Sequence, residues 1–147
     1  MKSLASILAA VCVLLVSLAS FAHAGEGWIE DFEQAKKLAK EQNKLILADF
    51  TGSDWCGWCI KLDKEVFSRP AFQSYVKDKY VLLKLDYPRK STQSDEIKKQ
   101  NKELGRTYAI RGYPTVLILD AEGNKKGQLG YVEGGPSKFN AELAKIK

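Results

Sequence analysis

The feature that most constrains the fold is a pair of cysteines, Cys56 and Cys59, at the junction of two different patterns. The short apolar run 45–50 before them is typical of a buried strand, and apolar residues after them recur at helical spacing. Side chains three positions apart lie on the same face of a helix, so the two sulfurs can bond to each other. The pattern predicts a strand, a loop over 51–54, and a helix that begins near Cys56.

The start of a helix gives the two cysteines different reactivities. Backbone N–H groups without helical partners and the helix dipole place partial positive charge beside Cys56, which stabilises a thiolate there. Cys56 is therefore predicted to be the exposed attacking thiol. Cys59, one turn further along, is predicted to be more buried and to resolve the mixed disulfide.

The N-terminus has the pattern of a secretory signal peptide. Lys2 is the only charged residue before Glu26, and it is followed by the apolar stretch 4–21 and by Ala22-His23-Ala24. A basic start, an apolar centre and an Ala-x-Ala end predict cleavage after Ala24, which leaves a single domain, 25–147. The alternative is an uncleaved membrane anchor, because the apolar stretch is almost long enough to span a bilayer. Cleavage predicts a periplasmic or otherwise extracytoplasmic protein.

Cleavage would also remove Cys12 and the only histidine, His23. A chain without histidine cannot carry Ser-His-Asp or Cys-His catalysis, and one cysteine pair cannot complete a four-ligand zinc site. We therefore expect no metal and no cofactor. The lysines are scattered without a basic block, so nucleic-acid binding is not expected either.

Two further readings of the cysteine pair stay open. A purely structural disulfide suits a small exported domain, although so short a loop stabilises little. The thiolates could instead hold Cu(I) in a copper-binding module, but Met1 is the only methionine that could assist as a soft ligand.

Helical and strand patterns alternate along the rest of the chain, which predicts an α/β fold. Strands separated by helices favour parallel pairing, a hairpin turn over 121–124 adds antiparallel strands, and helices should cover both faces of a mixed sheet. The expected helices are 31–42, the one from Cys56, 70–77, 94–108 and a last helix capped by Ser137; the expected strands are 45–50, 80–85, 116–119 and 126–131.

Three segments, in this order, carry a resemblance to a known family: "LILADFTGSDWCGWC", "VLLKLD" and "YAIRGYPTVLILDAEGNKKGQLGY". In them the sequence resembles the thioredoxin superfamily, specifically the secreted bacterial thioredoxin-like thiol–disulfide interchange proteins. The resemblance implies a thioredoxin fold, disulfides or dithiols of other proteins as substrates, and a membrane-bound electron donor. The chain has no room for a dimerisation domain of the kind that the exported isomerases carry. We therefore expect a monomer, and a reductase rather than an isomerase.

The resemblance also implies roles for single residues. The family's cis-proline falls on Pro114, which would stand against the cysteines, with Tyr113 and Thr115 contacting substrate; the alternative is an ordinary trans-proline turn. The family's buried carboxylate, which moves protons for the resolving cysteine, falls on Asp49, with Lys84 matching the lysine near it. Asp49 could otherwise be a strand-end residue facing solvent, and Lys84 could point to water.

The residues around the cysteines complete the predicted substrate surface. Trp55, Gly57 and Trp58 are expected to contact substrate, although Trp55 could instead pack in the core. Trp58 departs from thioredoxin itself, which has proline there, and the residues between the cysteines tune potentials over roughly −270 to −120 mV. Asp54 would disfavour the thiolate, which favours the reductase direction. The sequence thus predicts a Cys-Gly-Trp-Cys reductase, and it leaves open where the reduction potential lies within this range.

Overall fold

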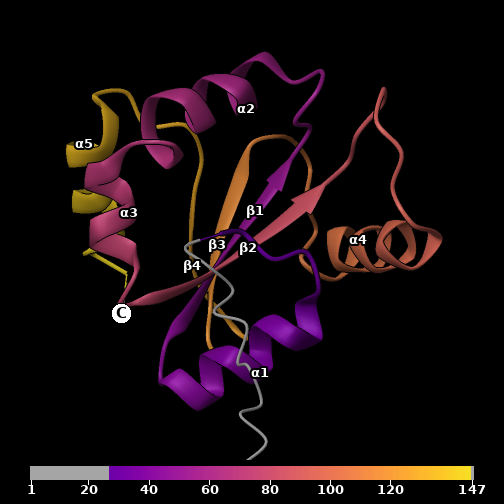
Figure 1. The fold of residues 1–147 in the computed structure, drawn as a ribbon, viewed down its shortest axis with the longest axis horizontal. Coiled ribbons are helices and arrows are strands. Elements are labelled where there is room, and N and C mark those ends of the chain that lie inside the picture. Colours follow the sequence, from indigo (N-terminus) through magenta and orange to yellow (C-terminus); the bar gives the residue numbers. More distant parts are fainter. Residues whose placement is uncertain (1–26, 147) are drawn as a thin grey trace, which may run out of the picture.

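The computed structural model describes residues 27–146 (Figure 1), so the predicted signal peptide and its cleavage site lie outside the described residues. Five α-helices, one π-helical turn (η1) and four strands follow one another in this part of the chain. They are α1 (Phe32–Gln42), β1 (Leu45–Thr51), α2 (Gly57–Leu62), η1 (Asp63–Phe67), α3 (Pro70–Val76), β2 (Tyr80–Asp86), α4 (Asp95–Thr107), β3 (Thr115–Leu119), β4 (Lys125–Leu129) and α5 (Gly135–Leu143).

The four strands form one mixed sheet in the order β2-β1-β3-β4. β1 and β2 are parallel, in a register that pairs Leu45 with Tyr80 and Thr51 with Asp86. β3 runs antiparallel to β1, and β4 runs antiparallel to β3. Ile29 extends the sheet beyond β2 through a single parallel bridge to Leu83.

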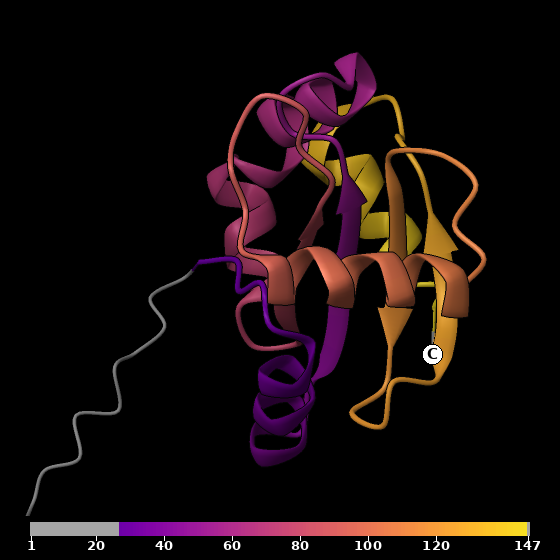
Figure 2. The same ribbon diagram turned by 90° about the vertical axis from the view of Figure 1, so that its right-hand side faces the viewer.

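The antiparallel direction of β3 departs from the expectation that strands separated by helices favour parallel pairing. Phe50, near the end of β1, pairs with Thr115, the first residue of β3. β3 therefore starts at the same edge of the sheet at which β1 and β2 end. The reason is visible in Figure 2, where α4 runs across the strands rather than along them and does not carry the chain back to the opposite edge.

Helices cover both faces of the sheet, as predicted. One core lies between the sheet and α2, η1, α3 and α5, and includes Leu47, Phe72 and Phe139. The other lies between the sheet and α1 and α4, and includes Phe50 and Leu104. The two groups of helices occupy opposite sides of the sheet in Figure 1. Alternate residues of β1 point to opposite cores, which is the period-two pattern of a strand buried on both faces.

The predicted boundaries hold at α1 and fail at α5. Asp31 caps α1, its carboxylate accepting the Gln34 N–H at 2.7 Å. Ser137 was expected to cap the last helix, but α5 begins earlier, with Gly134 as its N-cap at a φ of 107°. Glycine adopts this left-handed backbone without a Cβ clash, and Pro136 fits the first helical turn because no hydrogen bond is needed from its nitrogen. β4 also lies one to two residues earlier than the predicted 126–131.

Within residues 27–146, no helix combines the length and the apolar character needed to cross a membrane.

Candidate active site

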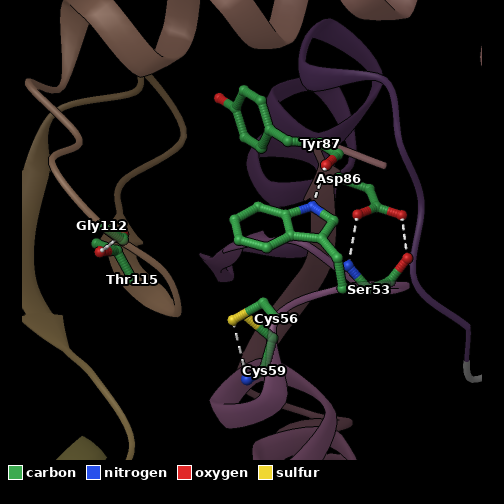
Figure 3. The surroundings of a disulfide bond; sticks show 8 residues. Ser53, Cys56, Cys59, Asp86, Tyr87, Gly112 and Thr115 are labelled. Atoms are coloured by element: carbon green, nitrogen blue, oxygen red, sulfur yellow. Dashed lines mark hydrogen bonds between the residues drawn. A yellow bond between two sulfur atoms is a disulfide. The ribbon is translucent and has the colours of Figure 1, made fainter. Parts of the chain in front are cut away.

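The site is built where the parallel strands β1 and β2 end side by side. The backbone N–H and the hydroxyl of Ser53, just after β1, both donate to the carboxylate of Asp86, the last residue of β2 (Figure 3). Asp86 is buried. Each of its two carboxylate oxygens accepts one of these hydrogen bonds from Ser53. The pairing fixes the course of the chain between β1 and the cysteines.

Cys56 and Cys59 form a disulfide at the start of α2, with their Cα atoms 5.2 Å apart (Figure 3). Cys56 is the N-cap of α2, and its sulfur accepts the Cys59 N–H at 3.2 Å. The predicted helix start at the cysteines is confirmed. A backbone donor directed at Sγ of Cys56 is the contact that would stabilise a thiolate on this residue.

The prediction that Cys56 is exposed is wrong for the disulfide form. The exposed fraction is 7% for Cys56 and 4% for Cys59, so both are buried and their order is only narrowly as expected. The neighbours in the sequence, Gly57 and Trp58, are exposed, and an added Cβ at Gly57 would meet no atom within 4 Å. The accessible surface at the disulfide therefore consists largely of the two residues between the cysteines.

Asp49 is buried in the middle of the sheet, on the face that α2 covers. It is 6% exposed, and its Oδ1 has no hydrogen-bond partner. Its strand neighbour Leu47, two positions earlier and therefore on the same face, packs into the core beneath α2. Asp49 does not face solvent.

The surroundings of Asp49 favour its neutral form. Burial raises the pKa of Asp49 to about 7, the nearby charge of Lys84 lowers it, and the charges of Asp63 and Asp86 raise it further. Lys84 is the partner of Asp49 in the β1–β2 register. A carboxyl group with this pKa can take up and release a proton near neutral pH.

The Tyr113-Pro114 peptide bond is cis, as predicted. Thr115, which follows, is buried, and its hydroxyl donates to the Gly112 carbonyl at 2.7 Å across the turn (Figure 3). Because Phe50 and Thr115 are register partners, this turn lies at the edge of the sheet from which the cysteine loop emerges. Tyr113 and Pro114 are partly exposed there.

The Trp55 indole packs against Gly52 of the active-site loop, and neither core includes it. Its Nε1–H donates to the carbonyl of Tyr87 at 2.8 Å, and its ring meets that of Tyr113 edge-on with centroids 5.8 Å apart. The guanidinium of Arg89 lies 3.7 Å from the centre of the same ring. The indole therefore joins the cysteine loop, the end of β2 and the cis-proline turn.

The carboxylate of Asp54 binds the backbone of the 89–91 loop. It accepts the backbone N–H groups of Arg89, Lys90 and Ser91 at 2.7–2.9 Å. These hydrogen bonds lower the pKa of Asp54 to about 2. From the sequence, the negative charge of Asp54 is expected to oppose a thiolate. Three backbone N–H groups donate to this carboxylate and stabilise its charge instead.

We expect Gly52→Ala to lower the stability of the domain by about 2 kcal/mol, the usual cost of forcing an extra methyl into a packed site. An added Cβ would lie 2.4–2.7 Å from three atoms of the Trp55 indole, which its hydrogen bond to Tyr87 prevents from moving freely. Urea unfolding measures the change. Gly57→Ala is the control and should leave the midpoint nearly unchanged; equal stability of both variants would contradict this account of Trp55.

Trp58 projects from α2 onto the surface, with an exposed fraction of 57%. Its ring lies 5.1 Å from that of Tyr131, and the Lys61 ammonium lies about 5 Å from the centres of both rings. The hydroxyl of Tyr131 donates to Glu65. Trp58 is thus held in place while one face stays open beside the disulfide, where a bound chain could contact it.

Sequence reasoning missed Tyr87, Arg89 and Tyr131. Tyr87 could have been found, because it directly follows the second buried strand, whose end must lie beside the end of the first if the two are parallel. Arg89 and Tyr131 lie in loops of ordinary composition, and no local signal marks them.

No group of three or more His, Cys, Asp and Glu side chains that could hold a metal ion occurs within residues 27–146.

The sequence from residue 32 to 147 matches the thioredoxin-like domain family, and the chain belongs to this family. It is 31% identical over 118 residues to the disulfide bond reductase DsbH of Chlamydia pneumoniae, which covers 80% of this chain and 69% of that protein. It is 32% identical over 103 residues to the thioredoxin-related protein DsbJ of the same organism, across 70% of this chain but only 30% of DsbJ.

Solved structures agree with these relatives. The structure of a DsbH oxidoreductase superposes with a TM-score of 0.77 at 29% identity, over 81% of this chain and 82% of that one. The oxidised C-terminal domain of Neisseria meningitidis DsbD gives 0.60 at 18% identity, over 82% of this chain and all of that domain, which supports the fold. The predicted thioredoxin fold is confirmed, and with its Cys56–Cys59 pair the protein is a thiol–disulfide oxidoreductase.

Proposed function

We propose that this protein is exported and reduces disulfides in other extracytoplasmic proteins with its Cys-Gly-Trp-Cys couple. The observation that carries the proposal is the buried Asp49 beneath the helix that starts at the cysteines, a carboxyl group with a pKa of about 7 and an unpartnered oxygen. A purely structural disulfide needs no proton carrier at that place.

In the dithiol form, the Cys56 thiolate attacks one sulfur of the substrate disulfide. An S–S bond forms between Cys56 and the substrate, the substrate disulfide breaks, and one substrate thiolate leaves. Cys59 then attacks the sulfur of Cys56, which forms the internal disulfide and releases the second substrate sulfur. Two electrons have passed to the substrate.

Asp49 serves the second step. Its carboxylate accepts the proton of the Cys59 thiol, so that Cys59 becomes a nucleophile, and the proton then passes on to the departing substrate sulfur. A group that titrates near neutral pH suits this role because it can both take and give the proton. Pro114, Tyr113 and Thr115 hold the substrate chain beside Cys56, with Trp55, Gly57 and Trp58 as the opposite contact surface.

The reductase direction is supported by the surroundings of Cys56. Its sulfur accepts a single hydrogen bond from the residues that the structure describes, the one from the Cys59 N–H. A strong oxidant needs a strongly stabilised thiolate, and no cationic side chain within residues 27–146 donates a hydrogen bond to this sulfur. The DsbH relative also bears the name of a disulfide bond reductase.

Export and partners complete the proposal. The signal-peptide pattern of residues 1–24 supports an extracytoplasmic location. A membrane-bound electron donor would return the disulfide to the dithiol, and the protein acts as a monomer.

A redox titration against glutathione tests the direction. We expect a reduction potential closer to that of thioredoxin, about −270 mV, than to the value of about −120 mV typical of a dedicated oxidant. The fraction of dithiol is read from Trp fluorescence or from thiol alkylation at each ratio. A potential near −120 mV would overturn the reductase direction while leaving the oxidoreductase class intact.

A further inference from the structure

A groove that shares only Tyr113 with the proposed substrate contacts lies between α4 and the segment that leads to the cis-proline. The less exposed part of its lining, here called the floor, holds the partly buried Tyr87, Ile110 and Tyr113 together with the buried polar residues Asp86 and Asn101. Its rim carries four cationic side chains, Lys98, Lys102, Arg106 and Arg111. In Figure 2, α4 lies across the sheet face and is followed by the chain that turns toward β3.

The floor of this groove is continuous with the redox site. The rings of Tyr87 and Tyr113 are 5.0 Å apart, and the ring of Tyr113 is 5.8 Å from that of Trp55. Trp55 directly precedes Cys56, and Tyr113 directly precedes Pro114. A chain lying on this floor would therefore run toward the disulfide.

The rim has one sign of charge. Lys98, Lys102 and Arg106 are spaced four residues apart, so they form a stripe along one side of α4, and Arg111 comes from the segment after the helix. All four are exposed. Lys98 pairs with Asp95 at 3.3 Å, whereas the other three make no ion pair with any residue between 27 and 146.

Among the described residues, one acidic side chain, Asp86, lines the groove against these four cationic ones, and its two carboxylate oxygens accept the N–H and the hydroxyl of Ser53. Cationic side chains are therefore in excess around the aromatic rings of the floor. Clefts lined by one sign of charge concentrate ligands of the opposite sign.

We propose that this groove binds an acidic, extended segment of the partner polypeptide and thereby guides the partner's disulfide to Cys56. Apolar side chains of the segment pack on Tyr87 and Tyr113, and its carboxylates pair with the guanidinium and ammonium groups of the rim. Arginine suits this role because its planar donor fork matches a carboxylate. The binding stands on the groove alone, while the guidance of a disulfide rests on the proposed function.

Binding is tested first with peptides that contain no cysteine. Two fluorescent peptides are identical, including two leucines, except that four glutamates in one are lysines in the other. We expect the glutamate peptide to bind the purified protein at least about tenfold more tightly at low salt, and the preference to disappear near 1 M salt, where charges are screened within about 3 Å. Fluorescence anisotropy measures both affinities.

A charge-reversed variant locates the binding. K102E/R106E/R111E should lose the preference for the glutamate peptide, whereas the matched control K125E/K126E/K138E, with the same change in net charge on β4 and α5, should keep it. Two results would contradict binding in the groove: an equal loss of the preference in both variants, or no preference for the glutamate peptide in the unaltered protein. If the triple variant does not fold, the salt dependence of the unaltered protein and the single variant R111E decide instead.

The reaction is tested separately. The same two peptides, each closed by a disulfide loop, and an uncharged small disulfide are given to the reduced protein. Faster reduction of the glutamate peptide, by about the factor found for binding, supports guidance to Cys56. Reduction of both peptides at equal rates contradicts guidance. Failure to reduce any of the three disulfides would overturn the proposed function and the guidance, while the binding result stands by itself.

Discussion

We expect Cys56→Ser to reduce the rate of insulin-disulfide reduction by roughly three orders of magnitude or more, because removing an attacking nucleophile from a site that acts as a unit abolishes most of its catalysis. Within residues 27–146 the only other thiol is Cys59, which is at least as buried and is placed to attack Cys56 rather than a substrate. The turbidity of precipitating insulin chains measures the rate. Substantial activity in this variant would show that Cys56 is not the attacking thiol.

Substitutions of the two cysteines should affect the reaction in different ways. In Cys59→Ala the first exchange remains possible but resolution does not, so we expect a stable mixed disulfide between Cys56 and the substrate, visible on a non-reducing gel. Cys12→Ser, which removes the remaining cysteine of the sequence, is the matched control and should retain full activity. Normal turnover by Cys59→Ala would rule out its role as the resolving residue.

The second large effect is on stability. We expect Asp49→Asn to raise the melting temperature at pH 8 by on the order of 10 °C, since one pKa unit corresponds to about 1.4 kcal/mol and each kcal/mol shifts a domain of this size by a few degrees. Burial holds the pKa of Asp49 at about 7, against 3.8 for the free side chain. The folded protein must therefore bear the cost of an ionised, buried carboxylate above neutral pH.

The pH dependence gives the sign of this effect. Below about pH 4 Asp49 is protonated in both the folded and the unfolded chain, so wild type and variant should melt alike. Between about pH 4 and pH 7 only the unfolded chain releases the proton, and wild-type stability should fall relative to the variant as the pH rises. Above pH 7 the difference should stay constant.

Asp120→Asn provides a control of opposite sign. Hydrogen bonds from Asn124 hold the pKa of Asp120 below its usual value, so this carboxylate adds stability above its unfolded pKa and loses that contribution as the pH falls. Its replacement should lower the melting temperature at pH 8. If both variants moved in the same direction, the shifts would reflect the amide substitution and not the titration of Asp49.

The parts of the site that could be predicted are those that a local pattern specifies. The cysteine pair lies where a strand pattern meets a helix pattern, and Asp49 is an acid inside an apolar run, which indicates burial. Pro114 was found because it sits in a string that resembles the family, and its cis bond is confirmed.

The parts that could not be predicted depend on which distant segments meet. The low exposure of Cys56 is a property of the folded surroundings, and the tie between Asp54 and the 89–91 loop joins positions about 35 residues apart. The antiparallel β3 followed from the crosswise direction of α4, which no periodicity encodes. The early start of α5 required the left-handed backbone of Gly134, whereas serine at an expected helix start gave a stronger but misleading signal.

The bridge from Ile29 bears on where this domain begins. The N–H of Ile29 donates to the Leu82 carbonyl at 3.0 Å, and its own carbonyl accepts the Lys84 N–H at 2.8 Å, along the outer side of β2. The match to the family begins only at residue 32, so a chain trimmed to that boundary would leave these two groups of β2 unpaired. Unpaired strand edges invite pairing with other molecules and aggregation. The residues just before α1 thus cover part of the outer edge of β2, and we expect the domain to need them in order to stay soluble.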